Sequence, residues 1–256
     1  MIDTRELAQR RSFARQVIGQ MSRLVKDRYI SGSPADVESE QLFRSQVSRR
    51  FPNDPVAGEE LGYDPGSDHN GWLVDPLDGS SNHSQGIPLF AVSIAYRIKG
   101  KTVLGLISDP VRGEWFEALD GKGICCGGPS PARKPASGPA VICLSPRWRA
   151  AYPDWRQQLP SGTKQRSLGS IALEMAWISQ GRIQAGAWFR THPWDVCAGD
   201  LLIQESGGRV TDVQKSKVGE KFATAAGADI FDKALQVTIS SSLAERGGDA
   251  QDQDTV

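Results

Sequence analysis

The sequence predicts an α+β protein, because helical and strand patterns are mixed along the chain in an order typical of α+β layers. Three observations carry this prediction. Apolar residues recur at helical spacing through residues 4–30. Strand patterns then dominate residues 90–119, and helical patterns return at 167–181 and 195–208.

The first part of the chain is expected to be mostly helical. The helical spacing of residues 4–30 ends at the SGSP sequence of residues 31–34. A second helical pattern leads through Leu42 and Val47 to Phe51, where the following proline ends it. The sequence therefore predicts two consecutive helices before the first strand.

The middle and last parts of the chain are richer in strands. Strands are expected at 72–74, 90–98, 103–108, 114–119, 141–144, 183–188, 209–213 and 221–226. Helices are expected at 167–181, 195–208 and 230–237. We expect residues 1–239 to form one domain of two intimate halves, at about 1–130 and 140–239, around a Pro- and Gly-rich loop at 127–139. The polar residues 240–256 are expected to form a flexible tail.

The composition excludes several classes of protein. The 256 residues contain 30 Lys and Arg against 30 Asp and Glu, so the formal net charge is zero and no nucleic-acid partner is expected. No apolar run approaches the roughly 20 residues of a membrane span, and the N-terminal residues lack the apolar core of a signal peptide. The four cysteines have neither CxxC spacing nor the density of a disulfide scaffold, so we expect a reduced, cytoplasmic protein without a membrane partner.

The sequence WLVDPLDGSSN at residues 72–82 carries the clearest chemical pattern. Proline cannot donate to a sheet ladder, so the strand is expected to end there and to place both Asp75 and Asp78 at its C-terminal end. Two carboxylates with a backbone carbonyl between them suit Mg²⁺ better than a transition metal. Gly79 allows close backbone approach, and Ser80, Ser81 and Asn82 are typical of a helix start whose N–H groups face an anion.

Other acidic residues are ambiguous by themselves. Glu59 and Glu60 follow a glycine in a loop and could be an ordinary solvated pair. Asp195 lies at the start of a helix, where an N-cap is the simpler explanation, and Asp36 could equally cap the second helix. The WLVDPLDGSSN sequence could likewise be an Asx turn followed by a serine-capped helix.

Taken together and in this order, these motifs resemble those of the inositol monophosphatase family, which contains Mg²⁺-dependent, lithium-sensitive phosphatases. The resemblance rests on two long motifs in register, Trp72–Asn82 and the WDVCAGDLLIQESGG sequence that begins at Trp194. The Gly-Glu-Glu sequence that ends at Glu60 lies upstream at a fitting distance, and the match covers roughly residues 7–238.

The resemblance implies a role for each matching residue. The implied metal ligands are Glu59, Asp75, the Leu77 carbonyl, Asp78 and Asp195, with Glu60 beside the first of them. The implied pair that orients the attacking water is Asp36 and Ser80, which with Glu60 make up the expected catalytic residues. The expected phosphate- and substrate-binding residues are Asp78, Gly79, Ser80, Ser81, Trp188, Arg190 and Asp195.

The resemblance also implies a function and an architecture. The expected reaction is hydrolysis of a phosphate monoester on a small phosphorylated metabolite, by direct attack of water activated by two or three Mg²⁺ ions. No Ser or Cys is recognisably paired with one of the three histidines, so a covalent intermediate is not expected. The implied fold is a layered αβαβα sandwich, the implied assembly is a homodimer, and the implied activity is lithium-sensitive.

Three departures from the family pattern bear on the substrate. The loop before Asp36 is short, and Trp188 occupies the position where inositol-specific members place an acidic residue against the substrate hydroxyls. For Trp188 itself, an ordinary strand aromatic is the favoured interpretation. Arg190 could bind a second anionic group or be a solvated surface residue. Candidate substrates are inositol monophosphate, fructose 1,6-bisphosphate, histidinol phosphate and 3′-phosphoadenosine 5′-phosphate. A non-catalytic regulatory binding protein is the alternative from another class.

Overall fold

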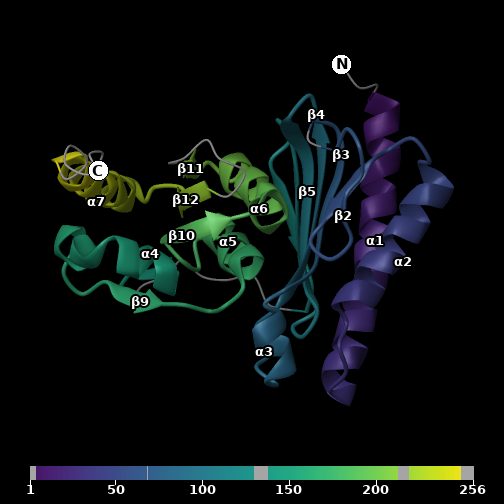
Figure 1. The fold of residues 1–256 in the computed structure, drawn as a ribbon, viewed down its shortest axis with the longest axis horizontal. Helices are drawn as coiled ribbons and strands as arrows, with labels where there is room; N and C mark the ends of the chain where they lie inside the picture. The colour runs from purple at the N-terminus through teal and green to yellow at the C-terminus, as the bar shows by residue number, and fades with distance from the viewer. Residues whose placement is uncertain (1–3, 68, 130–137, 213–218, 249–256) are drawn as a thin grey trace, which may run out of the picture.

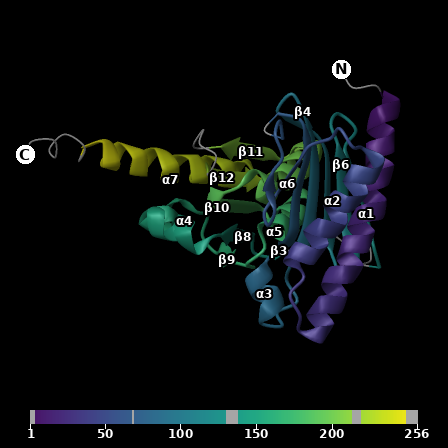
Figure 2. The same cartoon turned by 45° about the vertical axis from the view of Figure 1, so that its right-hand side comes forward.

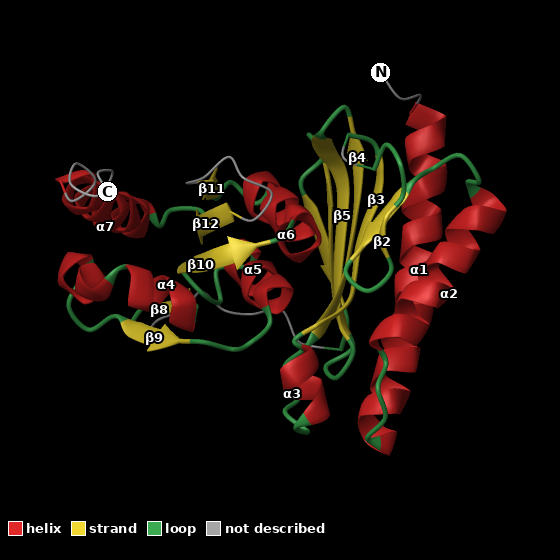
Figure 3. Ribbon diagram, viewed as in Figure 1, coloured by secondary structure: helices red, strands yellow, loops and turns green. Residues whose placement is uncertain are grey.

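The structure is a computed structural model, and it describes residues 4–67, 69–129, 138–212 and 219–248. Its elements lie in five layers that alternate helix, sheet, helix, sheet and helix across the molecule (Figures 1 and 3). This arrangement confirms both the α+β class and the αβαβα sandwich that the family resemblance implied.

The first sheet is built entirely from the first half of the chain. Its strands are β1 (Val56–Gly58), β2 (Gly62–Tyr63), β3 (Gly71–Asp78), β4 (Ala91–Ile98), β5 (Lys101–Asp109), β6 (Glu114–Leu119) and β7 (Ile124–Gly127). They lie in the order β2-β1-β3-β4-β5-β6-β7, and only β1 and β3 are parallel neighbours. Strands β4 to β7 follow one another as antiparallel hairpins; β4 to β6 were expected from the sequence, whereas the four-residue β7 was not.

Two helices, α1 (Thr4–Ser31) and α2 (Asp36–Arg50), cover one face of this sheet (Figure 1). Helix α2 packs on β3, and α1 packs on β4 and β5. The Phe13 ring of α1 lies 5.2 Å from the Phe51 ring and 5.5 Å from the Trp72 ring. The apolar spacing that predicted both helices therefore reflects burial against the sheet.

The second sheet comes from the second half of the chain. Its strands are β8 (Val141–Leu144), β9 (Lys164–Arg166), β10 (Ala185–Thr191), β11 (Arg209–Asp212) and β12 (Gly219–Thr224), in the order β11-β12-β10-β8-β9. Its outer face carries α4 (Pro146–Ala151), the 3₁₀ helix η1 (Pro153–Gln158) and α7 (Asp229–Gly248) (Figure 2).

The middle layer consists of α5 (Ile171–Ser179) and α6 (Pro193–Glu205), which pack against both sheets. One apolar cluster joins Leu73 and Ile107 of the first sheet to Leu202 of α6. Because the two sheets share this layer, we continue to treat residues 1–239 as one proposed domain of two intimate halves.

Several boundaries differ from those expected. Helix α5 begins at Ile171 rather than near residue 167, because Gly169 has φ 82° and the Ser170 side chain caps the helix. Residues 240–248, expected to belong to a flexible tail, continue α7 instead. The LAER sequence in that segment consists of good helix formers. The remaining tail residues, 249–256, and most of the 127–139 loop lie outside the described residues.

Two further properties follow from the described residues. None of their helices is both long enough and apolar enough to cross a membrane. All four cysteines are described and none forms a disulfide, in agreement with their spacing in the sequence.

Candidate metal and phosphate site

Asp75 and Asp78 lie on one strand, because β3 continues through Pro76 and does not end there as expected. Asp75 pairs with Ser93 of β4 and Asp78 pairs with Ala91, so two residues of β3 lie opposite one residue of β4. Such a bulge tolerates proline, since the ladder is interrupted there. Residues three apart on a regular strand face opposite sides of the sheet, and the extra residue brings both aspartates to one side.

Four carboxylates meet where β1 and β3 end. Glu59 follows β1, Asp75 and Asp78 are on β3, and Asp195 is in the first turn of α6. The Glu59 and Asp75 carboxyl groups are hydrogen-bonded to each other, and the charges of Asp78 and Glu59 both act on Asp195. The structure thus brings together the four side chains that the sequence indicated as metal ligands.

Backbone and side-chain donors hold the three aspartates in place. Asp75 Oδ1 accepts from Leu77 N at 3.0 Å, Asp195 Oδ2 from His192 N at 2.8 Å, and Asp78 Oδ2 from Ser170 Oγ at 2.7 Å and Ala172 N at 2.5 Å. Asp195 is the third residue of α6 and not its N-cap, which is His192. Asp36 likewise begins α2 without capping it, because the cap position belongs to Ala35.

The four carboxyl groups of the site are not neutralised by nearby positive side chains of the described chain. Burial raises the pKa of Asp78 to about 6, and burial with the charges of Asp78 and Glu59 raises the pKa of Asp195 to about 7. Burial and then the neighbouring carboxylates raise the pKa of Asp75 well above its usual range. Within the described chain, no Lys or Arg is among the causes that act on these carboxyl groups.

The donor set fits Mg²⁺, because it consists only of carboxylate and carbonyl oxygens. As the side chains of the described residues stand, no three from His, Cys, Asp and Glu are spaced to enclose an ion. Burial and the charges of neighbouring carboxylates raise the pKa values of Glu59 and Asp75. A divalent cation would offset the same excess charge that protons offset here.

Asp36 and Ser80 line one cavity of about 340 Å³, although none of the four carboxylates is part of its lining. Asp36 begins α2, and Ser80 begins the short helix α3 (Ser80–Ser84) that follows β3. After burial, the charge of Asp36 is among the causes that raise the pKa of Glu59 and of Glu60. The expected acid and hydroxyl thus share a cavity within electrostatic reach of the carboxylate cluster.

Gly79 joins β3 to α3 in a conformation that favours glycine. Its φ is 94°, and an added Cβ would lie 3.0 Å from the carbonyl oxygen of Leu89. Ser80 and Ser81 are exposed in the first turn of α3, where backbone N–H groups have no acceptor within the helix. These amides are therefore available to an anionic group of a substrate.

Glu40 of α2 is a residue that the sequence analysis missed. Its side chain is fully buried and accepts from the backbone N–H groups of Glu60 at 2.8 Å and Leu61 at 3.3 Å, while Arg44 Nε donates to it at 2.8 Å. An added Cβ at Gly58 would lie 2.1 Å from Glu40 Oε1. Glu40 therefore fixes the turn that carries the first metal ligand. A glutamate on the apolar face of a predicted helix was the available clue.

Asn82 and Ser170 were also missed as supporting residues. Asn82 Nδ2 donates to the carbonyl oxygens of Leu89 at 2.6 Å and Leu168 at 2.7 Å, so it ties α3 to the loop before α5. Ser170, the N-cap of α5, donates to Asp78. The phosphate-facing turn and the second half of the chain are thus held together at the site.

Small residues set the position of α6 and hence of Asp195. An added Cβ at Gly105 of β5 would lie 2.9 Å from the Cα and carbonyl oxygen of Ala198. An added Cβ at Gly199 would lie 2.6 Å from the Cβ of Met175 on α5. Helix α6 therefore lies directly against the backbone of β5 at Gly105, and its own Gly199 lies directly against the Met175 side chain of α5.

The structure corrects the expectation that Trp188 binds substrate. Its side chain is only 1% exposed, packs in the core of the second half and donates from Nε1 to Glu174 Oε2 at 2.5 Å. Arg190 is exposed and has φ 60°, at an irregularity of β10 between Phe189 and Thr191. Its role in binding an anion stays a prediction.

Comparison with known proteins agrees with a phosphatase fold. A model of the inositol monophosphatase family matches residues 31–247. The Nus factor SuhB of Pseudomonas aeruginosa is 34% identical over 223 residues, covering 81% of this chain and 82% of the relative. The fructose-1,6-bisphosphatase/inositol-1-monophosphatase of Thermotoga maritima is 30% identical over 182 residues, covering 69% of each. The inositol monophosphatase structure from Anabaena has a TM-score of 0.74 and 26% identity, covering 91% of this chain and 97% of that one. This chain belongs to the inositol monophosphatase family.

Proposed function

We propose that the protein is a Mg²⁺-dependent hydrolase that releases phosphate from a small phosphorylated metabolite by direct attack of water. The observation that carries the proposal is the meeting of Glu59, Asp75, Asp78 and Asp195, with no Lys or Arg of the described chain among the groups that act on their pKa values. Family membership supports the reaction class.

In this proposal the four carboxylates and the Leu77 carbonyl hold two or three Mg²⁺ ions, with Glu60 contacting a metal indirectly. Bound Mg²⁺ would supply positive charge to the phosphate and would lower the pKa of a bound water below the 15.7 of bulk water. Asp36 and Ser80 orient the attacking water from the cavity that they share. The amides of Gly79, Ser80 and Ser81 hold the phosphate, beside Asp78 and Asp195.

Direct attack by water is favoured over a covalent intermediate. His83 follows the serines of α3, but its Nε2 is 3.1 Å from the Val25 carbonyl oxygen, so this ring nitrogen is engaged with the backbone. A serine nucleophile would need a free base at this point. A metal site in the same place removes that need.

Four phosphate monoesters of small metabolites are candidate substrates. The similarity to the fructose-1,6-bisphosphatase/inositol-1-monophosphatase of Thermotoga maritima supports inositol monophosphate and fructose 1,6-bisphosphate. Histidinol phosphate and 3′-phosphoadenosine 5′-phosphate remain alternatives, and the exposed Arg190 favours a substrate with a second anionic group. We further propose a cytoplasmic homodimer, which light scattering would test against the mass of one chain.

A non-catalytic regulatory protein is the second candidate function. It is favoured by the name of the Pseudomonas aeruginosa relative, a Nus factor, which denotes no enzymatic activity. The presence of all four carboxylates favours the enzyme. The expectation of no nucleic-acid partner belongs to the enzyme proposal and is tested with it, by measuring RNA binding at physiological salt.

The decisive experiment measures phosphate release from the four candidate substrates with Mg²⁺, with EDTA and with added Li⁺. We expect release from at least one substrate, loss of activity in EDTA and inhibition by Li⁺. Absence of release from every substrate, combined with measurable Mg²⁺ binding and RNA binding, would favour the regulatory protein.

A further inference from the structure

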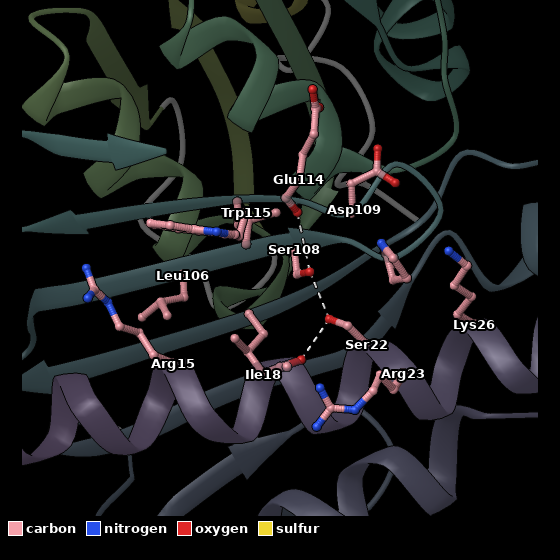
Figure 4. A pocket seen from close by; sticks show the side chains of 14 residues that line it. Arg15, Ile18, Ser22, Arg23, Lys26, Leu106, Ser108, Asp109, Glu114 and Trp115 are labelled. Carbon is pink, nitrogen blue, oxygen red and sulfur yellow. Dashed lines mark hydrogen bonds between the residues drawn. The ribbon is translucent and has the colours of Figure 1, made fainter. Parts of the chain in front are cut away.

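A second cavity, of about 460 Å³, lies between α1 and the first sheet (Figure 4). Its walls are α1, β5, the start of β6 and the turn between those strands. Leu106 in its wall belongs to the apolar cluster under α1 and α2, whereas Leu73 on the other face of the sheet belongs to the cluster with α5 and α6. The cavity therefore lies on the face of the sheet opposite α6 and the candidate metal site.

A glycine in α1 helps to keep this cavity open. An added Cβ at Gly19 would meet only Arg23 Nη1, at 3.9 Å, so the helix faces free space at this point. Glycine weakens a helix interior, and no contact of this residue requires it. The space is therefore not a consequence of close packing between α1 and the sheet.

The inner wall of the cavity is apolar. Ile18 and Leu106 are nearly completely buried, and the half-buried ring of Trp115 completes the wall. The Ser22 and Ser108 hydroxyl groups are hydrogen-bonded to each other at 2.8 Å across the gap between α1 and β5 (Figure 4). An apolar wall of this extent favours the body of an organic molecule over a free inorganic ion.

The rim of the cavity is positively charged. Arg15, Arg23 and Lys26 are exposed on α1 and line the cavity from that side. Arg15 is engaged by Glu117, but Arg23 and Lys26 have no carboxylate within 4.0 Å among the residues that the structure describes. Two cations are thus available beside an apolar wall.

The acidic residues of the lining do not cancel this charge. Asp109 is paired with Arg112 at 2.9 Å, and Glu114 is paired with Arg182 at 2.7 Å. Both carboxylates point away from α1 in Figure 4.

We propose that this cavity is a second ligand site, which binds a small organic anion with an apolar or aromatic body. The body lies against the wall formed by Ile18, Leu106 and Trp115, and the anionic group lies at Arg23 and Lys26. The volume lies within the range of small-molecule pockets, roughly 300–1,000 Å³. The site shares no residue with the proposed phosphatase site and does not depend on its activity.

Calorimetric titration of the full chain with three probes tests separately whether the ring and the negative charge of the ligand contribute to binding. Naphthalene-2-sulfonate carries both the ring and the charge, 2-naphthalenemethanol carries only the ring, and methanesulfonate carries only the charge. We expect one molecule of naphthalene-2-sulfonate to bind per chain, about tenfold more tightly than either comparison probe. The reason is that only this probe contacts both the apolar wall and the positively charged rim. Equal affinity for the neutral and the charged naphthalene would overturn the proposal.

Three variants locate the binding. Gly19→Leu fills the cavity from a helix that tolerates leucine and should abolish binding. Lys26→Met should weaken binding about two- to fivefold, as expected for one partly solvated charge. Arg147→Gln, an exposed arginine on α4, is the matched control and should bind like the original chain.

Two results would contradict the site. Undiminished binding by both Gly19→Leu and Lys26→Met would place the probe elsewhere. A chain that is dimeric in light scattering, and monomeric as Gly19→Leu, would show that a second copy and not a small anion covers this cavity.

Discussion

Asp78 shows how the chain orients one carboxylate of the proposed metal site. Its Oδ2 accepts two hydrogen bonds from the start of α5, while burial raises its pKa to about 6. The hydrogen bonds favour the charged form and the burial opposes it. The balance leaves an oriented group whose charge a cation would stabilise.

Asp78→Asn should therefore retain the fold and lower the activity at least about 100-fold. Substitution of residues that only hydrogen-bond to metal ligands already lowers metal affinity or activity 10–100-fold. The asparagine oxygen can still accept from Ser170 and Ala172, so the melting temperature should change little. Phosphate release and circular dichroism check the two parts. The control is Asp154→Asn on η1, an exposed position, and original activity in Asp78→Asn would refute the assignment.

Gly58→Ala should disturb the turn before Glu59 through Glu40. The added methyl group would lie 2.1 Å from Glu40 Oε1, so we expect a loss of about 1–3 kcal/mol in the free energy of unfolding. Mg²⁺ binding, measured by calorimetry, should weaken with it. In contrast, Gly19→Ala in α1 should raise the free energy of unfolding by about 0.5–1 kcal/mol. Equal effects of the two substitutions on stability would contradict the role proposed for Glu40.

The residues of the site differ in how far the sequence could predict them. The four carboxylates were identifiable because they lie inside or beside recognisable motifs. Glu40 was not, because its role depends on a contact between α2 and a turn some twenty residues away. For Trp188 the sequence left two interpretations open, and only its burial decides between them.

At the scale of elements, an ion-pair cluster fastens α1 to β6. Glu117 is buried on β6 and accepts from Arg11 Nε at 2.7 Å and Arg15 Nε at 2.5 Å. Burial alone would raise the pKa of Glu117, but the hydrogen bonds from Arg15 and Arg11 outweigh it and lower this pKa. The charged carboxylate is therefore the form that stabilises the contact.

A pH dependence of stability follows from this lowered pKa. The stabilisation is present above the ordinary glutamate pKa of 4.5 and is lost as the pH falls through the lower value of the folded protein. Glu117→Gln should therefore cost about 2 kcal/mol at pH 7 and progressively less below pH 4.5. Denaturant unfolding of the original chain and of Glu117→Gln, at pH 7 and below pH 4.5, checks this. A stability difference between the two proteins that does not change with pH would contradict it.

Sequence patterns predicted long elements better than their ends. The hairpin strands β4 to β6 are recognisable because each is an alternating or apolar-rich run of six or more residues. Strands β1 and β2 have three and two residues and carry no such pattern. The continuation of β3 through Pro76 required knowledge of the pairing with β4, which alone reveals the bulge.

At the scale of the whole molecule, the two sheets depend on one shared layer. Leu73, Ile107 and Phe116 of the first sheet are buried in one cluster with residues of α5 and α6, which follow much later in the chain. The first half therefore cannot bury one face of its own sheet.

A fragment of residues 1–129 should consequently fail to fold alone. It would expose the apolar face that α5 and α6 cover, so we expect a poorly dispersed NMR spectrum and no cooperative unfolding. Addition of a fragment that begins at residue 138 should restore native dispersion. Cooperative unfolding of the first fragment by itself would show that the halves are independent domains.

The close contact between Gly105 and Ala198 has a consequence for ion size. No side chain separates β5 from α6 there, so the close approach of two backbones contributes to the position of α6 and of its Asp195. Mg²⁺ requires oxygens at about 2.0–2.1 Å and Ca²⁺ at about 2.3–2.6 Å. A methyl group at position 105 would raise α6 and widen the site while leaving every ligand unchanged. If the proposed metal site is correct, its preference between small and large divalent ions should therefore change on Gly105→Ala, a substitution outside the proposed ligands.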